Sequence, residues 1–257
     1  MAAGLLAVLL VVCAGCGAPA RPQTLAIAAA ADLRFALDEI AREFRAAHPA
    51  VDVQVAYGSS GNFYSQIRNQ APFDLFLSAD VDYPRRLAQE GAAEADSLFV
   101  YGVGRIVVWV LASSPLDVAR LQMRALEADA VRHVAIANPQ HAPYGRAAEA
   151  AMRSSGVYSQ VAPKLVLGEN IAQTLEFVQS GAAEVGIVAL SLALAPPVRD
   201  QGKYWEVPLD AYPRVEQGGA ILKRARASQA AREFRAFLLT GGGARILRQY
   251  GFYLPEK

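Results

Sequence analysis

The segment TLAIAAAADLRFALDEIAREFRAAHPAVDVQVAYGSSG, residues 24–61, decides the fold. Its beginning, residues 24–31, is a short apolar run typical of a strand buried on both faces. Residues 33–47 then place apolar side chains at helical spacing with charges between them, and residues 51–56 alternate as a half-buried strand does. A strand, a helix and a second strand in this order predict a parallel sheet with helices on its faces.

The remaining chain continues the same alternation. Helices are expected near residues 63–69, 85–89, 121–128, 146–154, 172–180, 228–239 and 243–249. Strands are expected near residues 74–78, 105–112, 133–137, 164–167, 184–189, 205–209 and 219–223. We therefore expect an α/β protein of two lobes, each a mainly parallel sheet flanked by helices, with a ligand cleft between the lobes.

The strongly apolar strand at residues 105–112 opens the second lobe. We expect lobe I to comprise residues 24–103 and 213–257, and lobe II residues 104–212. The chain would cross between them near residues 101–104 and 211–214. Ligand binding would then stabilise a closed arrangement of the lobes by a hinge motion.

Composition excludes several classes of function. The 257 residues are 53% hydrophobic and 19% charged, with 25 Lys and Arg against 24 Asp and Glu, which excludes a disordered chain. A net charge of +1 argues against nucleic acid as a partner. Two cysteines, both near the amino terminus, and three scattered histidines argue against a zinc enzyme.

The amino terminus is interpreted as a targeting segment. An apolar run at residues 5–12 is too short to span a bilayer and is followed by Cys13-Ala-Gly-Cys16. Residues 1–16 are thus expected to be a signal peptide whose end resembles a lipobox, with Cys16 lipidated, and residues 17–23 a tether. Cys13 and the absence of Lys or Arg in residues 1–4 depart from that pattern, so a plain cleaved signal remains the alternative. Either kind of signal implies a periplasmic or cell-surface protein. Contact with the membrane is expected only if Cys16 is lipidated, through that lipid anchor.

Four predicted strand-to-helix junctions carry small or hydroxyl-bearing residues, at residues 30–33, 57–62, 138–145 and 168–171. The first N–H groups of a helix lack intrahelical partners and favour anions. Each junction alone is also compatible with an ordinary cap or turn. Together they supply N–H and O–H donors without an obligatory Lys or Arg, which predicts a site for a small multivalent oxyanion.

Motifs along nearly the whole chain resemble those of the molybdate-binding proteins of bacterial ABC transporters, which are type II periplasmic binding proteins. They include AAADL at residues 29–33, YGSSG at 57–61, APFDLFLSAD at 71–80 and IANPQHAPYG at 136–145. The resemblance implies a monomeric receptor that binds molybdate, and tungstate, between its lobes and delivers it to a membrane permease. It implies no cofactor, and molybdenum only as the bound oxyanion.

Carried over by position, the resemblance implies a specific set of ligand-binding residues. These are Ala31, Asp32, Ser60, Tyr144 and Ile171, with Ser59, Gly61, Gly145 and Asn170 next to them.

Two positions depart from the family's pattern. Some members have a ligand-binding tyrosine where this chain has Ala189, and Tyr144 is expected to supply that phenol from the opposite loop. The second departure is Asp32, whose ionised carboxylate would repel a dianion. The favoured interpretation is that its side chain caps the helix and only its N–H binds. One alternative is that the Asp32 carboxyl is protonated. The other is that the oxyanion is protonated and donates a hydrogen bond to the Asp32 carboxylate.

An enzyme is the main competing class of function. The chain has no G-x-S-x-G elbow, no phosphate loop and no H-E-x-x-H motif, and Ser59 and Ser60 have no obvious histidine partner. A receptor of the same fold for sulfate, phosphate, phosphonate or a carboxylate remains the alternative ligand class. The sequence does not separate molybdate from tungstate.

Overall fold

The computed structural model describes residues 22–254. The predicted signal peptide, with Cys13 and the lipidation candidate Cys16, lies outside the described residues, as does most of the predicted tether. None of the described helices is long and apolar enough to cross a bilayer.

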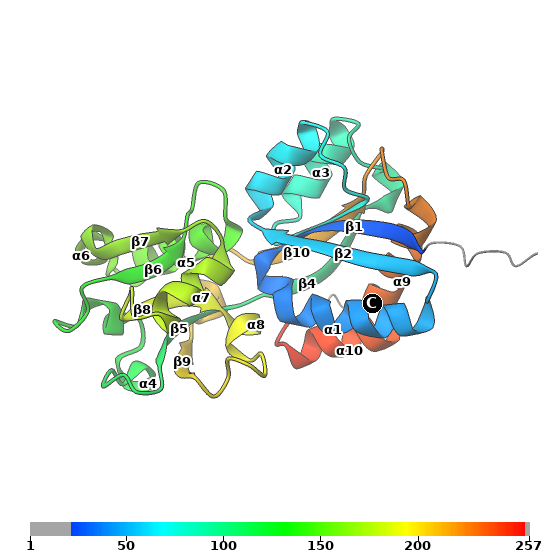
Figure 1. The fold of residues 1–257 in the computed structure, drawn as a ribbon. Helices are drawn as coiled ribbons and strands as arrows, with labels where there is room; N and C mark the ends of the chain where they lie inside the picture. Colours follow the sequence, from blue (N-terminus) through cyan, green and yellow to red (C-terminus); the bar gives the residue numbers. More distant parts are fainter. Residues whose placement is uncertain (1–21, 255–257) are drawn as a thin grey trace, which may run out of the picture.

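The first lobe is built on a five-stranded sheet with the order β2-β1-β3-β10-β4 (Figure 1). Its strands are β1 (Gln23–Ala30), β2 (Val51–Gly58), β3 (Leu75–Ser78), β4 (Phe99–Gly104) and β10 (Val215–Ile221). Strand β1 pairs in parallel with β2 and β3, whereas β10 is antiparallel to β3 and β4. Four of the five strands therefore run in one direction and β10 is reversed.

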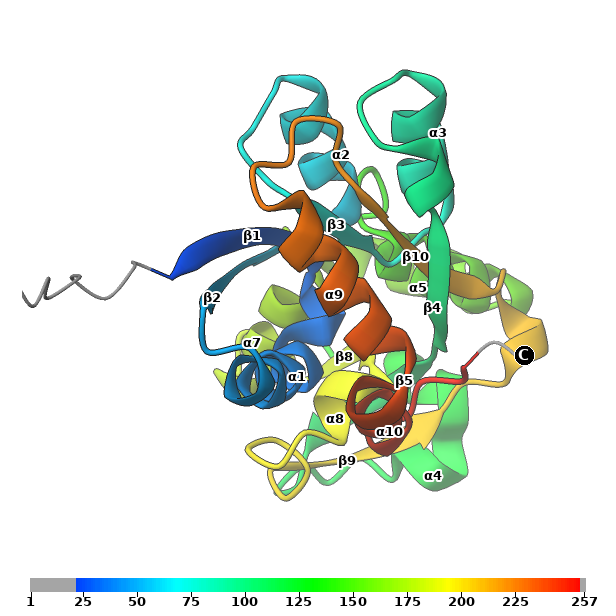
Figure 2. The same cartoon turned by 90° about the vertical axis from the view of Figure 1, so that its right-hand side faces the viewer.

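Helices cover both faces of this sheet (Figure 2). The helices α1 (Arg34–Ala47), α9 (Ser228–Leu239) and α10 (Gly241–Gln249) lie on one face, and α2 (Ser60–Arg68) and α3 (Asp82–Gln89) on the other. Helix α1 forms because its apolar side chains share one stripe that is buried against the sheet: Ala36, Leu37, Ile40, Ala41 and Phe44. A short 3-10 turn, Ala31–Leu33, joins β1 to α1.

The second lobe repeats this topology with the order β7-β6-β8-β5-β9. Its strands are β5 (Ile106–Leu111), β6 (Val134–Ala137), β7 (Leu165–Gly168), β8 (Val185–Ala189) and β9 (Gly202–Glu206). Here β5 is the reversed strand, antiparallel to β8 and β9. The helices are α4 (Val118–Leu121), α5 (Pro143–Ser154), α6 (Tyr158–Val161), α7 (Ile171–Gln179) and α8 (Leu190–Ala193).

The chain passes between the two sheets twice. Only Arg105 separates β4 from β5, and residues 207–214 lead back from β9 to β10. The predicted α/β architecture of two lobes is confirmed, with sheets that are mixed because one strand in each runs against the others. The boundaries proposed for the lobes stay a prediction. The strands of the first sheet fall within residues 23–104 and 215–221, and those of the second within 106–206.

Candidate ligand-binding site

The four predicted junctions meet between the lobes around one small cavity of about 10 Å³. Drug-sized ligands occupy pockets of roughly 300–1,000 Å³, so a cavity of this size excludes them and leaves room only for a small ion. Seven of the nine candidate residues line it: Ala31, Asp32, Ser59, Ser60, Tyr144, Asn170 and Ile171. Among residues 22–254, those that line the cavity include no Lys or Arg.

The other two candidates, Gly61 and Gly145, stand just behind the lining. The N–H of Gly61 donates to the carbonyl of His141 at 2.9 Å, which joins the two lobes. A Cβ on Gly145 would lie 2.0 Å from the carbonyl oxygen of Ala137, so only glycine permits the close packing of α5 on β6. Both residues therefore support the site through the backbone.

Three helices begin at the cavity and aim backbone donors at it. Ser60 and Ile171 are the first residues of α2 and α7, and Tyr144 follows Pro143 in the first turn of α5. Within residues 22–254, no acceptor is found for the N–H of these three residues. Asn170 accepts from the next two N–H groups of α7, so its cap leaves the Ile171 N–H free. This convergence favours an anion.

Two serine hydroxyls add to these donors. The Oγ of Ser60 accepts a 2.9 Å hydrogen bond from the N–H of Ala79, so its own proton is free to donate into the cavity. The Oγ of Ser59 lies 3.0 Å from Nδ1 of His141, across the cleft. His141 thus approaches the site through Ser59 and is absent from the described lining.

Asp32 and Tyr144 form a buried network with Gln217 of β10. The Tyr144 hydroxyl donates to Oδ2 of Asp32 at 2.9 Å, and Nε2 of Gln217 donates to the same oxygen at 2.7 Å and to the Tyr144 hydroxyl at 2.9 Å. Asp32 and Tyr144 are 1% and 2% exposed. Oδ1 of Asp32 has no hydrogen-bond partner among the described residues.

This network corrects the favoured interpretation of Asp32. Its side chain does not cap a helix, because neither the 3-10 turn nor α1 has a side-chain cap. It turns instead toward Tyr144 and Gln217, which both donate to its Oδ2. The phenol of Tyr144 is also engaged, by Asp32, so in this structure the free donor that Tyr144 offers the cavity is its backbone N–H.

Burial sets the electrostatics of the network. Desolvation raises the pKa of Asp32 from 3.8 to about 6, and the hydrogen bonds from Gln217 and Tyr144 oppose that rise only in part. Burial, with the nearby Asp32 carboxylate, raises the pKa of Tyr144 well above its usual value. Tyr144 is therefore a neutral donor, and Asp32 titrates close to neutrality.

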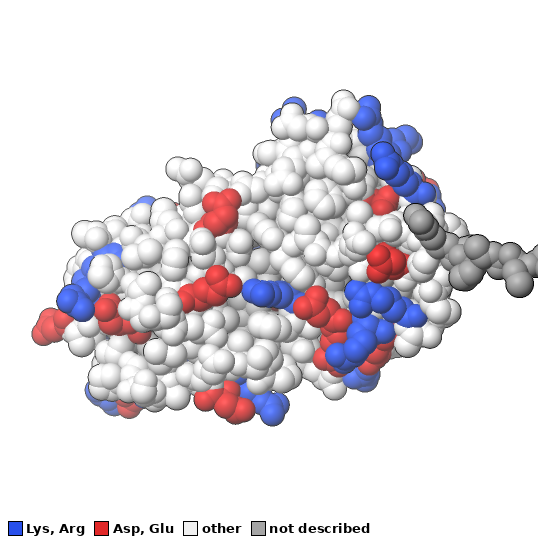
Figure 3. Space-filling model, viewed as in Figure 1, with Lys and Arg blue, Asp and Glu red and all other residues white. Residues whose placement is uncertain are grey.

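Further contacts join the lobes at the rim of the cleft. Arg34 of α1 pairs with Glu176 of α7 at 3.4 Å, and the Asn62 amide donates to Glu169. The lobes thus touch across the cleft on both sides of the cavity. On the face of the molecule that Figure 3 shows, acidic and basic side chains are interspersed, with no large patch of one sign.

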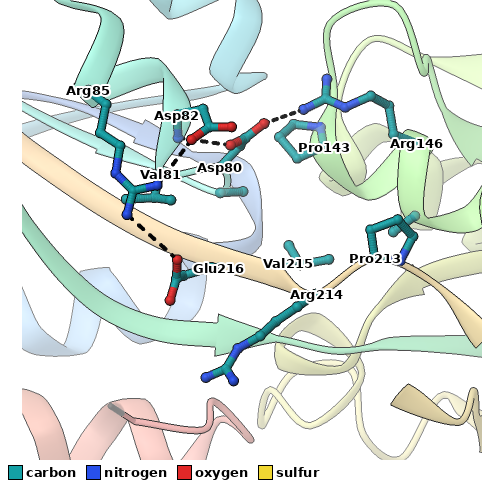
Figure 4. A pocket seen from close by; sticks show the side chains of 12 residues that line it. Asp80, Val81, Asp82, Arg85, Pro143, Arg146, Pro213, Arg214, Val215 and Glu216 are labelled. Atoms are coloured by element: carbon teal, nitrogen blue, oxygen red, sulfur yellow. Dashed lines mark hydrogen bonds and ion pairs between the residues drawn. The ribbon is translucent and has the colours of Figure 1, made fainter. Parts of the chain in front are cut away.

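A larger pocket of about 390 Å³ lies on the other side of the α5 start (Figure 4). It has three arginines, but two of them are neutralised. Arg146 pairs with Asp80 at 2.5 Å, and Arg85 pairs with Asp82 at 3.1 Å. The side chain of Arg214 points away from these pairs (Figure 4). The smaller cavity, with its unpaired neutral donors, is therefore the better candidate for an oxyanion.

Sequence reasoning missed three residues that shape the site. They are Gln217, Gly104 and Ser191, whose hydroxyl donates to the carbonyl of Asp32 at 2.8 Å. A Cβ on Gly104 would lie 2.0 Å from the Tyr144 hydroxyl oxygen, so this glycine makes room for the network. The one available signal was Gln217 itself, a polar residue that is fully buried within strand β10.

The fold and the cleft are those of a two-lobed solute receptor, and comparison with known proteins agrees. Residues 25–253 match the family described as bacterial extracellular solute-binding protein. The chain is 41% identical over 202 residues to the molybdate-binding protein ModA of Rhodobacter capsulatus, covering 78% of this chain and 77% of the relative. It is 35% identical over 250 residues to ModA of Azotobacter vinelandii, covering 95% and 97%.

A solved structure supports the same assignment. The periplasmic molybdate-binding protein of Azotobacter vinelandii superposes with a TM-score of 0.85 at 29% identity, covering 90% of this chain and 100% of that one. The chain belongs to the bacterial extracellular solute-binding proteins, as a relative of the ModA proteins. These relatives are named as binding proteins, not as enzymes.

Proposed function

We propose that this protein is the extracytoplasmic receptor of an ABC importer and binds molybdate, and tungstate, in the cavity between its lobes. The observation that carries the proposal is the convergence of three unpaired helix N–H groups and the Ser60 hydroxyl on one small cavity between the lobes. The names of the relatives support the choice of oxyanion. Within residues 22–254, no group of three or more His, Cys, Asp or Glu could hold a metal ion, so the ligand would be held through its oxygens.

The ligand-binding set follows from this geometry. Ser60, Tyr144 and Ile171 would donate backbone N–H groups and Ser60 its hydroxyl, while Ala31 and Asp32 close the cavity from the 3-10 turn after β1. Ser59, Gly61, Gly145 and Asn170 would hold these donors in place. A receptor for sulfate, phosphate, phosphonate or a carboxylate is the alternative, since the same donors suit those anions.

Titration calorimetry with molybdate, tungstate, sulfate and phosphate tests the proposal. We expect saturable binding of molybdate and tungstate and much weaker binding of the other two. Tight binding of sulfate or phosphate, with none of molybdate, would favour the alternative.

One substitution tests the mode of binding. Proline is tolerated at the first position of a helix, and Asn170 before it is extended, with φ −152° and ψ 177°. Ile171→Pro therefore removes one N–H and preserves α7. Losing a hydrogen bond to a charged group costs about 1.5–3 kcal/mol, so the affinity for molybdate should fall about 10- to 100-fold. Ile171→Val, which keeps the N–H, is the control and should bind as the parent does.

The finer assignments are proposals as well. We infer a monomer that acts in the periplasm or at the cell surface and docks on a membrane permease when the cleft is closed. Lipidation of Cys16, which lies outside the described residues, would tether it to the membrane. Mass spectrometry of the protein purified from its native host tests the anchor, because a lipidated chain would begin at Cys16 and carry the added acyl mass.

A further inference from the structure

Asp32 is one of the residues that line the proposed oxyanion cavity, and its carboxyl has one oxygen with two hydrogen-bond donors and one oxygen with none among the described residues. Oδ2 accepts from both Tyr144 and Gln217, whereas Oδ1 is buried without a partner among the described residues. A buried acceptor without a partner is costly, and an ionised one beside a dianion is repelled as well. A proton on Oδ1 removes both penalties and turns the oxygen into a donor.

Resting on the proposed function, we propose that the protein takes up one proton together with the oxyanion and holds it between Oδ1 of Asp32 and an oxygen of the ligand. The proton comes from the solvent, no other bond forms or breaks, and Oδ2 keeps both of its hydrogen bonds. The carboxyl then joins the neutral donors of the site, so ligand recognition depends on a protonated acid.

Among residues 22–254, no nearby cation compensates the Asp32 charge. Arg34, at the start of α1, pairs with Glu176 of α7. On β2, Tyr57 donates its hydroxyl to an acidic side chain of α1, and on α8 Ser191 donates to the Asp32 carbonyl and carries no charge. These are the groups that the elements packed against the Asp32 turn contribute.

The other neighbours of the carboxyl are neutral as well. Tyr144 and Gln217 donate to Oδ2, and the nearby Tyr101 donates its hydroxyl to the carbonyl of Ser78. The pKa of Asp32 is already raised to about 6 by burial before any ligand is present, and a dianion in the cavity raises it further. Between these two values of the pKa, binding draws a proton from solution.

Calorimetric titration of the full chain with sodium molybdate at pH 8, in two buffers of different ionisation enthalpy, measures the proton uptake directly. The parent protein should take up close to one proton per molybdate, and its affinity should fall up to about tenfold for each pH unit between pH 7 and 9. Asp32→Asn supplies a neutral amide and should take up no proton, with an affinity nearly independent of pH. The ligand's own titration is the same for both proteins and cancels from the comparison.

Asp200→Asn is the matched control, since Asp200 has a side chain 87% exposed far from the cavity, and it should behave as the parent does. Proton uptake of zero in the parent, or equal uptake in parent and Asp32→Asn, would overturn the inference. If the variant does not fold, the measurement on the parent alone still decides between uptake and none. If the parent binds other oxyanions and not molybdate, it is the proposed function that fails, which this titration reveals separately.

Discussion

The Tyr144 hydroxyl donates to Oδ2 of Asp32 at 2.9 Å, and this buried bond joins helix α5 of one lobe to the end of β1 in the other. The two side chains come from sequence positions 112 residues apart and meet only when the lobes are together. The bond therefore stabilises the closed arrangement, in which the cavity is enclosed.

Tyr144→Phe should weaken molybdate binding although its backbone N–H is retained. The bond is made in the closed, ligand-bound arrangement, where Asp32 holds its proton, so it contributes about 0.5–1.5 kcal/mol, as a neutral hydrogen bond does, and the dissociation constant should rise about 2- to 10-fold. Calorimetry measures the change, and Tyr204→Phe on the exposed face of β9 is the control. An unchanged affinity would show that this bond does not contribute to closure.

The stability of the ligand-free protein should depend on pH through Asp32. Its pKa in the folded state, about 6, lies above the unfolded value of 3.8, so the folded state binds the proton more tightly. The resulting stabilisation is complete below pH 3.8 and is lost as the pH rises through 6. Relative to Asp32→Asn, the parent should lose about 2–3 kcal/mol of unfolding free energy between pH 4 and pH 8. Urea unfolding of both proteins at several pH values measures this, and parallel curves would contradict the raised pKa.

Gly104→Ala should disrupt the site by displacing the side chains of Tyr144 and Gln217. Its Cβ would lie 2.0 Å from the Tyr144 hydroxyl oxygen and 2.6 Å from Nε2 of Gln217, so the phenol must move. We expect a loss of molybdate affinity at least as large as that of Tyr144→Phe, with the secondary structure retained by circular dichroism. Gly102→Ala in the same strand is the matched control, because its Cβ would find its nearest neighbours at an acceptable 3.4 Å. Equal behaviour of the two alanine variants would argue against a steric role for Gly104.

The rim ion pair between Arg34 and Glu176 should contribute little. Their side chains are 47% and 58% exposed, and exposed pairs contribute about 0.2–1 kcal/mol. A double-mutant cycle with Arg34→Ala and Glu176→Ala, read out as molybdate affinity, should therefore give a coupling below about 1 kcal/mol that disappears in high salt. A larger coupling that survives salt would place the control of closure at the rim.

Sequence periodicity predicted most of the fold because its signals are local. The stripe of apolar residues in α1 predicts a helix, and the apolar run of β1 predicts a strand. Both elements were expected within a residue or two of their observed bounds. The short helices α6 and α8, of four residues each, were missed because a single turn is too short to show a period. The reversal of β5 and β10 depends on how the chain crosses between sheets, which no local pattern records.

The candidate site was only partly predictable. The junctions before α2 and α7 could be located from their small or polar residues, because capping is a local property, although α2 begins at Ser60, three residues before the expected helix. The direction of the Asp32 side chain could not, since it is set by Gln217, 185 residues further along the chain. A contact of that kind depends on tertiary packing, so the sequence left the role of Asp32 open among three alternatives.

The pairing of β10 with β4 shifts register between Gln217 and Gly218, immediately after the strand enters the first sheet. At this irregularity the Gln217 amide faces the Asp32 carboxyl, close to the segments where the chain crosses between the two lobes. Mutations along β10 could thus retune which anions are accepted, and at what acidity, without altering any group that contacts the cargo. Selectivity in this receptor would therefore change through substitutions in β10 as readily as through substitutions in the cavity lining.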